Sequence, residues 1–278
     1  MRSSHQSYRR AGACLLPCAA LLAALISGCQ EGTRERAETA AAPAAPPASA
    51  SFDHSLFDRI LQTHVKDGLV AYASLKAEDE ANLDVYLQSL ADARGFAGPD
   101  DELAFWLNVY NASVIKGILD RYPNLKSVMD VEGFFDDKRW MAAGRLRSLN
   151  EIENEIIRPR FEDPRIHFIL VCAAQSCPPL QNRAMEGATL QSQFESATAS
   201  AVNSPEYVQI DQETKTLRMT RILSWYRDDF IRKYGTLETF VVRYREEPGK
   251  SQLKQGGYRY EFMDYDWALN DVGGSPTP

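Results

Sequence analysis

The residues best suited to chemistry lie in the stretch HFILVCAAQSCPP, which spans residues 167–179. A histidine opens an apolar run, Cys172 lies within it, and Cys177 closes it before two prolines. Cysteine thiolates are nucleophiles and metal ligands, and two nearby cysteines can also form a disulfide. The stretch therefore admits four interpretations: a nucleophile with its base, a disulfide, a metal site, or a core strand with incidental sulfur.

The run RIHFILVCAA, residues 165–174, predicts a buried β-strand, because β-branched and aromatic residues dominate it between turn-forming segments. His167 and Cys172 are five residues apart and would point to opposite faces of that strand. Cys177 would lie far beyond the other end of it. His167 should then be a base for neither thiol, and we expect it to be a hydrogen-bonded core histidine.

His64 is the remaining candidate base for a catalytic Cys177, since His54 adjoins the expected linker. A cysteine nucleophile needs an imidazole nitrogen within hydrogen-bond reach. Asn108 and Asn111 lie three residues apart in an apolar segment and could orient that imidazole or donate to an oxyanion. Buried amides more often satisfy backbone groups. The sequence thus offers a catalytic set together with a structural alternative for its two asparagines.

The first 29 residues predict the compartment in which these thiols would work. Three arginines precede the apolar run AGACLLPCAALLAALI, as in a secretory signal peptide. The run is short and interrupted by Pro17, which argues against a transmembrane helix. The ending ISGC resembles a bacterial lipobox with Cys29 as the lipidated residue, carrying acyl chains such as palmitate. Gln30 resembles the sorting signal for the outer membrane of Gram-negative bacteria, so we expect an outer-membrane lipoprotein that faces the periplasm.

The rest of the chain divides by composition. Residues 30–52 are rich in Ala, Pro and Ser and predict a disordered linker, residues 53–270 predict one globular domain, and residues 271–278 predict a disordered tail. The net charge is −7 at pH 7, and the expected signal peptide contains no acidic residue, so the mature chain would be more acidic still. This charge argues against nucleic acid as a partner. The expected partners are the membrane, through the N-terminal lipid, and an envelope protein or peptide.

Of the five cysteines, only Cys172 and Cys177 would remain in the folded domain, where they would meet an oxidising compartment. A tight turn through AAQS could bring them within disulfide range. A disulfide is therefore the favoured interpretation, and a catalytic Cys177 is the alternative. A zinc site is disfavoured because two cysteines and one histidine lack the spacing of structural zinc. No metal or other cofactor is predicted.

Periodicity predicts the elements that position these residues. Helices are expected over 55–66, 78–93, 101–122, 148–157, 188–203, 221–235 and 236–245, with hairpins over 138–148 and 207–219 and a last strand within 257–270. The segment 101–122 is apolar nearly all round and should be a central, buried helix. The predicted class is α+β, with several helices packed around a small, mostly antiparallel sheet in a single domain.

Six ordered motifs also carry a family resemblance. They are HVKDGLVAYASLK, AFWLNVYNASVIKGIL, SLNEIENEIIRP, RIHFILVCAAQSCPPL, LSWYRDDF and DYDWALN. Together they resemble the bacterial branch of domain of unknown function family 547 over roughly residues 55–270. Ala71 and Met185 depart from the pattern, where an aspartate and a tyrosine are usual. The family has no assigned activity, so the resemblance implies a fold and a set of motif residues but no reaction.

Two functional classes remain open at this point. The first, which we favour, is a lipid-anchored binding or scaffolding module of the cell envelope. The alternative is a Cys-dependent hydrolase or transferase that uses Cys177, His64 and an asparagine on peptide or acyl bonds. The position of His64 relative to Cys177 distinguishes the two.

Overall fold

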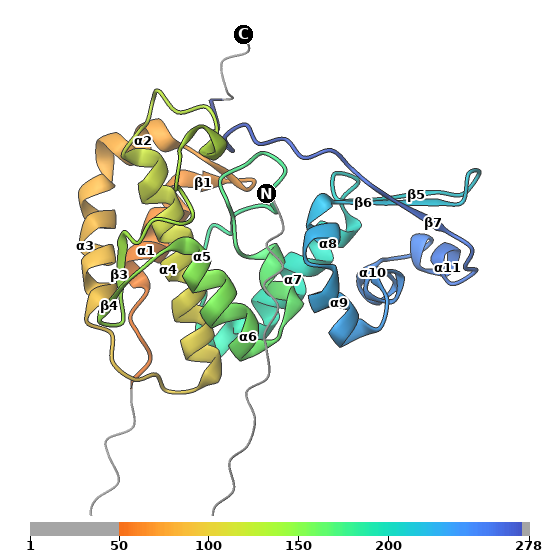
Figure 1. Ribbon diagram of the computed structural model, residues 1–278, viewed down its shortest axis with the longest axis horizontal. Coiled ribbons are helices and arrows are strands. Elements are labelled where there is room, and N and C mark those ends of the chain that lie inside the picture. The colour runs from red at the N-terminus through yellow and green to blue at the C-terminus, as the bar shows by residue number, and fades with distance from the viewer. Residues whose placement is uncertain (1–49, 274–278) are drawn as a thin grey trace, which may run out of the picture. The chain divides into compact units, whose positions relative to one another are not determined.

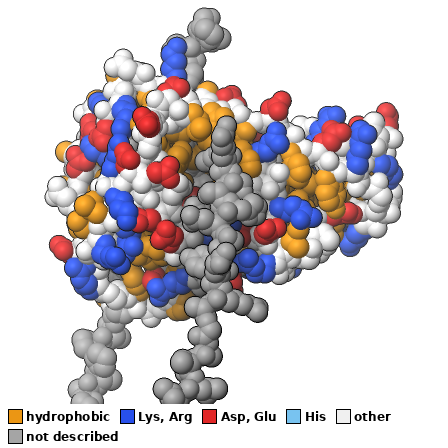
Figure 2. Space-filling view, viewed as in Figure 1, with side chains coloured by type: hydrophobic (Ala, Val, Ile, Leu, Met, Phe, Trp, Pro, Cys, Tyr) orange, Lys and Arg blue, Asp and Glu red, His pale blue; other side chains and the backbone are white. Residues whose placement is uncertain are grey.

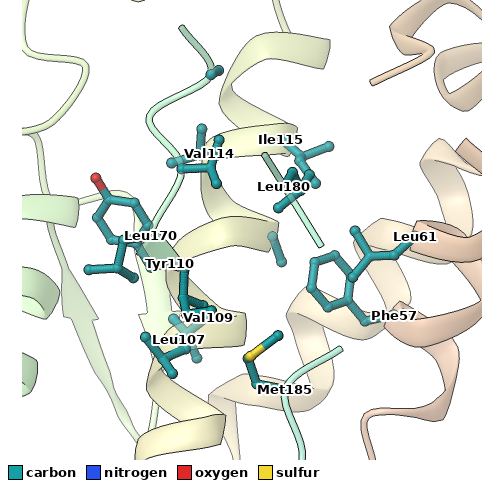
Figure 3. Close-up of a cluster of buried hydrophobic side chains, with 14 of the residues drawn as sticks. Phe57, Leu61, Leu107, Val109, Tyr110, Val114, Ile115, Leu170, Leu180 and Met185 are labelled. Atoms are coloured by element: carbon teal, nitrogen blue, oxygen red, sulfur yellow. The ribbon is translucent and has the colours of Figure 1, made fainter. Parts of the chain in front are cut away.

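Helix α4, Pro99–Leu119, is the central helix of the structure, a computed structural model that describes residues 50–273. A proline starts the helix and acidic residues fill its first turn, as the fixed φ of proline and the helix dipole favour. Beyond that turn almost every side chain is buried. Figure 3 shows Val109 and Ile115 of α4 in one hydrophobic cluster with Phe57. The prediction of a central, buried helix is therefore confirmed.

Figure 1 shows the order of the elements along the described part of the chain. The other α-helices are α1 Ser55–His64, α2 Tyr72–Glu78, α3 Glu80–Ala91, α5 Leu149–Glu151, α6 Arg158–Phe161, α7 Leu190–Asn203, α8 Arg221–Trp225, α9 Arg227–Tyr234, α10 Leu237–Tyr244 and α11 Gly249–Leu253. Short 3-10 turns cover Val128–Asp130, Pro164–Phe168 and Gly187–Thr189, and a π-helical turn, Ile152–Ile157, joins α5 to α6.

The strands form small, separate sheets. They are β1 Val65–Lys66, β2 Leu69–Val70, β3 Trp140–Ala142, β4 Arg145–Arg147, β5 Val208–Asp211, β6 Thr216–Met219 and β7 Arg259–Phe262. The pairs β1–β2, β3–β4 and β5–β6 are antiparallel, and β7 joins β6 in parallel. The predicted α+β class is confirmed, and both predicted hairpins are present.

Two hydrophobic clusters make up the core, and both cysteines pack in the first of them. The first cluster includes α1, α3 and α4, on the left of Figure 1, and the second includes residues of α7, β5, β6 and α8–α10, on the right. Phe168 packs in the second cluster, whereas Ile166 and Ile169 pack in the first. The chain that carries the two cysteines therefore begins where the clusters meet.

The prediction of a strand over residues 165–174 is wrong. Pro164–Phe168 form a 3-10 turn, and the residues that follow pair with no neighbouring strand until an isolated bridge at Ala174. The reason is that a side chain of α4 forms the backbone hydrogen bonds that a neighbouring strand would otherwise form. The amide of Asn111 bonds to the backbone of Ile169 and Val171, so these buried groups are paired without a sheet ladder.

The folded part extends slightly past the predicted boundaries of 53 and 270. Phe52 packs against the core, and buried Asp271 accepts a hydrogen bond of 3.0 Å from the hydroxyl of Tyr122. The expected signal peptide, the lipidation site Cys29 and nearly all of the expected linker lie outside the described residues. Within residues 50–273 no helix is both long and apolar enough to cross a bilayer.

Candidate functional site

Cys172 and Cys177 lie side by side as free thiols and share one phenol. The backbone N–H of Cys172 donates to the sulfur of Cys177 over 3.1 Å. The hydroxyl oxygen of Tyr265 lies 3.1 Å from the sulfur of Cys177 and 3.3 Å from that of Cys172. The disulfide favoured from the sequence is not formed in this structure. Both sulfurs nevertheless lie within 3.3 Å of the same hydroxyl, that of Tyr265.

Helix α4 positions the first cysteine through Asn111. The side-chain amide donates to the carbonyl of Ile169 and accepts from the N–H of Val171, each over 3.0 Å. Asn111 thus fixes the backbone on both sides of Leu170, two residues before Cys172. A turn then closes toward the second cysteine, because the N–H of Cys177 donates to the carbonyl of Ala174 over 3.0 Å.

The C-terminal motif DYDWALN lies across this turn and delivers Tyr265 to it. The N–H of Gln175 donates to the carbonyl of Ala268 over 2.7 Å, and the N–H of Asn270 donates to the carbonyl of Ala173 over 3.0 Å. Figure 1 shows this segment crossing from the β5–β7 sheet back to the α4 side of the fold. The site is therefore assembled from sequence segments about ninety residues apart, as the pairing of Cys177 with Tyr265 records.

The surroundings shift the pKa values of the two thiols in opposite directions. Burial opposes ionisation of Cys177, but hydrogen bonds from the Cys172 thiol, the Tyr265 hydroxyl and nearby backbone N–H groups outweigh it and lower the pKa of Cys177. The interaction with Cys177, together with burial, raises the pKa of Cys172 well above that of an ordinary thiol. The first proton that the pair loses therefore leaves a thiolate on Cys177, with Cys172 still protonated beside it.

An aromatic cluster adjoins the thiols on the outside. Tyr265 contacts Trp225 and Trp267 with ring-centroid distances of 4.7 Å to each, and the two indoles stack at 5.8 Å. Trp225 is 46% exposed, although its helical spacing from Phe230 favours a core position for both. Only Phe230 is fully buried. We call Trp225, Tyr265 and Trp267 the aromatic face.

The comparison with protein families bears on this part of the chain. Residues 96–200 match the family model described as "Protein of unknown function, DUF547". Over these residues the chain is similar to DUF547. The resemblance seen in the sequence motifs is thereby confirmed for these residues. No curated protein and no solved structure matches the chain.

The residues matched to DUF547 contain both cysteines and Asn111, but the match does not extend to Tyr265 or Trp225. Because the DUF547 description names no activity, the chemistry has to be read from the side chains. No group of three or more His, Cys, Asp and Glu side chains among residues 50–273 is arranged to hold a metal ion. Of the side chains at this site, the two thiols are those suited to chemistry.

His64, the candidate base, is not at the thiols. Its Nδ1 lies 2.9 Å from the hydroxyl of Ser74 and its Nε2 lies 2.8 Å from a carboxylate oxygen of Asp79. Both ring nitrogens are therefore engaged, and no hydrogen bond joins His64 to Cys177 within the described residues. The structure does not bring the proposed nucleophile, Cys177, and the proposed base, His64, within hydrogen-bond distance.

Asn108 is also occupied elsewhere. Its amide donates to the carbonyl of Met185 over 2.8 Å and accepts from the N–H of the same residue over 2.9 Å. Asn111 is used in the same way on the thiol segment. Each amide bonds to loop backbone through both its nitrogen and its oxygen, so both asparagines are positioning residues that connect α4 to loop backbone, as the structural alternative expected.

A second buried cluster lies behind the thiols and contains His167. Its Nε2 lies 2.9 Å from Asp229, and its ring stacks on Tyr226 with a centroid distance of 3.7 Å. Arg158 donates to both carboxylate oxygens of Asp229 over 2.8 and 3.1 Å. The prediction that His167 is a hydrogen-bonded core histidine is confirmed.

Tyr226 of this cluster interacts electrostatically with both a buried carboxylate and one of the thiols. Glu153, 6% exposed, lies in the π-helical turn, an irregularity often found at functional sites. Burial and then the charge of Glu153 raise the pKa of Tyr226, to which Cys172 also contributes. Sequence reasoning missed Glu153, Tyr265 and the exposed Trp225. The motifs DYDWALN and LSWYRDDF were the only signals that pointed to the last two.

Proposed function

We propose that this chain is a lipid-anchored protein of the cell envelope whose two thiols exchange with disulfides of other polypeptides. The observation that supports the proposal is that Cys172 and Cys177 are adjacent free thiols joined by the hydroxyl of Tyr265. Their opposite pKa shifts are those of a pair in which one sulfur holds a thiolate and the other holds the proton. Such unequal pairs are suited to thiol–disulfide exchange.

The accessibility of the two sulfurs sets the order of the exchange. Cys172 is partly exposed, whereas Cys177 is 5% exposed. Because Cys172 is the more exposed of the two residues, we take its sulfur to be the one that an incoming disulfide meets first. As it attacks, its proton passes to the thiolate of Cys177, which acts as the internal base. A bond forms between Cys172 and one partner sulfur, and the partner's disulfide bond breaks to release its other sulfur as a thiolate.

The second step completes a two-electron reaction. Cys177 gives up its proton to the released thiolate and attacks the sulfur of Cys172. The Cys172–Cys177 disulfide forms, and the remaining partner sulfur leaves as a thiolate that takes a proton from water. The domain thereby loses two electrons and the one proton that the thiol–thiolate pair held, and the partner disulfide gains two electrons and two protons, the second of which comes from water. The reverse sequence would oxidise a partner dithiol.

The hydrolase or transferase alternative is less well supported by this geometry. His64 is held by Ser74 and Asp79, and the amides of Asn108 and Asn111 are held by backbone groups. A nucleophilic Cys177 would have neither a histidine base nor an amide oxyanion donor within reach among the described residues. In thiol–disulfide exchange no histidine is needed, because the second cysteine serves as the base for the first.

The envelope location is a separate part of the proposal and rests on the sequence of residues 1–30. Growth with an alkyne analogue of palmitate should label the chain, and Cys29→Ser should abolish the label. Fractionation of the wild-type chain should place it with the outer membrane. Labelling that survives Cys29→Ser would contradict the assignment of the lipidated residue.

Exchange itself is tested on the full chain with Cys14, Cys18 and Cys29 replaced by serine, so that Cys172 and Cys177 are the only cysteines. Incubation with oxidised glutathione should remove both titratable thiols and leave no glutathione attached, by mass spectrometry of the intact chain. Cys177→Ser should instead accumulate a glutathione adduct on Cys172. Cys172→Ser should react much more slowly, because the sulfur of Cys177 is buried.

The controls separate exchange from other thiol chemistry. His64→Gln should leave the rate of thiol loss unchanged per folded molecule, as judged by circular dichroism. A large loss of reactivity in that variant would restore the Cys–His alternative. If the wild-type pair keeps both thiols in excess oxidised glutathione while urea-unfolded chain loses them, the proposed exchange does not occur.

A further inference from the structure

The aromatic face is an exposed surface next to a buried thiol pair. Trp225 ends α8 with 46% of its surface exposed, and Trp267 stacks beside it. Tyr265 belongs to both groups, because its ring contacts the two indoles and its hydroxyl contacts both sulfurs. Figure 2 shows hydrophobic side chains along the course that the segment after β7 follows in Figure 1.

Burial of hydrophobic area does not explain the position of Trp225. A large aromatic side chain that serves only the core is normally covered, as Phe230 and Phe240 are. Exposed tryptophans are instead enriched where one surface binds another. The contact through Tyr265 makes the aromatic face continuous with the thiols.

The charge beside the aromatic face is negative at two exposed positions. Asp264 and Asp266 flank Tyr265 in the sequence and are both exposed. Asp266 has no ion-pair partner within residues 50–273, and Asp264 only approaches Arg221, at 3.9 Å. An occupant that carries a positive charge near an apolar side chain would match this arrangement.

We propose that the aromatic face is the docking site for the polypeptide whose disulfide exchanges with Cys172, and that it prefers a segment with an aromatic and a basic residue next to the cysteine. The inference rests on the proposed exchange and names its substrate class. A glycan could also stack on the indoles, but it carries no sulfur for the adjacent thiols. A polypeptide segment uses both features at once.

The experiment compares two disulfide-linked peptide dimers with oxidised glutathione. One peptide carries Lys-Phe before its cysteine and the other carries Ser-Ser. The Cys172–Cys177 thiol pair of the wild-type chain should react faster with the Lys-Phe dimer than with the Ser-Ser dimer. Trp225→Ala should slow that reaction about tenfold, the effect of losing an interface contact of roughly 1.4 kcal/mol. The same variant should leave the reactions with glutathione and with the Ser-Ser dimer within about twofold of wild type.

Tyr260→Ala is the matched control. Tyr260 is also an exposed aromatic residue, at 41%, but its hydroxyl bonds to Glu238 rather than to the thiols. The Tyr260→Ala variant should leave the reaction rates with both peptide dimers and with oxidised glutathione unchanged. Equal slowing of all three reactions by Trp225→Ala would overturn docking and assign Trp225 a role in shaping the thiols. Equal rates for the two peptides with wild type would overturn it as well.

A direct binding measurement distinguishes failure of docking from failure of exchange. The Lys-Phe peptide with serine in place of its cysteine cannot exchange, and it should change the tryptophan fluorescence of the wild-type chain but much less that of Trp225→Ala. If glutathione fails to oxidise the thiols while this peptide still binds, only the exchange is wrong. A response to chitotriose in place of the peptide would identify a glycan site and reject the polypeptide.

Discussion

The backbone N–H of Cys172 donates a hydrogen bond of 3.1 Å to the sulfur of Cys177. This contact gives the buried sulfur a fixed donor that no side-chain rearrangement can withdraw. With the hydroxyl of Tyr265 it explains why negative charge is favoured on the less exposed of the two cysteines. The exposed sulfur is left with the proton. The thiol pair is therefore divided by its surroundings into a reachable group and a basic group.

Tyr265→Phe should raise the pKa of Cys177, because the phenol donates to its sulfur while the ring contacts to Trp225 and Trp267 are kept. Loss of one hydrogen bond to a charged group corresponds to an increase of about one in the pKa. Titration of the thiolate by ultraviolet absorbance measures it, with Tyr260→Phe as the control. A titration curve that matches wild type would remove Tyr265 from the site.

Asn111→Ala should lower the free energy of unfolding by about 2–4 kcal/mol, because it leaves the buried carbonyl of Ile169 and N–H of Val171 unpaired. It should also slow exchange with glutathione, since the segment before Cys172 loses its support. Asn108→Ala is the matched control, because it breaks an equivalent double contact to Met185. It should cost similar stability, measured by urea denaturation, without changing the exchange rate of the folded chain. Equal exchange rates in the two variants would show that Asn111 does not position the thiol.

Asp229→Asn should destabilise the domain by about 2–3 kcal/mol, less than for a fully buried ion pair because Arg158 is partly exposed. The substitution removes the charge that accepts two hydrogen bonds from Arg158 and one contact from His167. Asp228→Asn, at the exposed neighbouring position, should change stability by less than about 0.5 kcal/mol. Thermal unfolding of the two variants side by side checks the difference. Similar melting temperatures would mean that the buried cluster contributes no net stability.

Acid should destabilise the domain between pH 6.5 and pH 4. Burial lowers the pKa of His54 to about 4 and also lowers that of His167 despite the neighbouring Asp229. Unfolded histidines bind protons near pH 6.5, so the unfolded chain takes up more protons than the folded chain as the pH falls through this window. The stabilisation is complete above pH 6.5, and the part due to His54, about 3 kcal/mol, is lost by pH 4.

Urea denaturation at several pH values measures this dependence. His54→Gln should flatten the slope between pH 6.5 and pH 4, whatever it does to stability at neutral pH. The lowered pKa of Asp229 acts in a different window, because its stabilisation is lost only below the ordinary carboxyl pKa of 3.8. A slope that is the same in wild type and His54→Gln would show that folding does not lower the pKa of His54.

Several elements could be predicted from the sequence because the forces that specify them are local. The apolar periodicity around α4, the polar turns of the β3–β4 and β5–β6 hairpins, and the motif strings within the residues similar to DUF547 all lie within short stretches. The same local reading failed at residues 165–174. An apolar run predicts that a segment is buried, but it does not predict which groups will form hydrogen bonds with the backbone of that segment. Here the amide of Asn111, in α4, forms them.

The sequence by itself determined the inventory: two cysteines and three histidines in the folded part, and a buried central helix with two amides. Only the tertiary structure decided how these groups are used. It brought Tyr265 to the sulfurs from 88 residues away, occupied both nitrogens of His64 with Ser74 and Asp79, and left Trp225 exposed. The physical reason is that hydrogen bonds and pKa shifts depend on distances of a few ångströms, which are set by the packing of the whole chain and not by spacing along it.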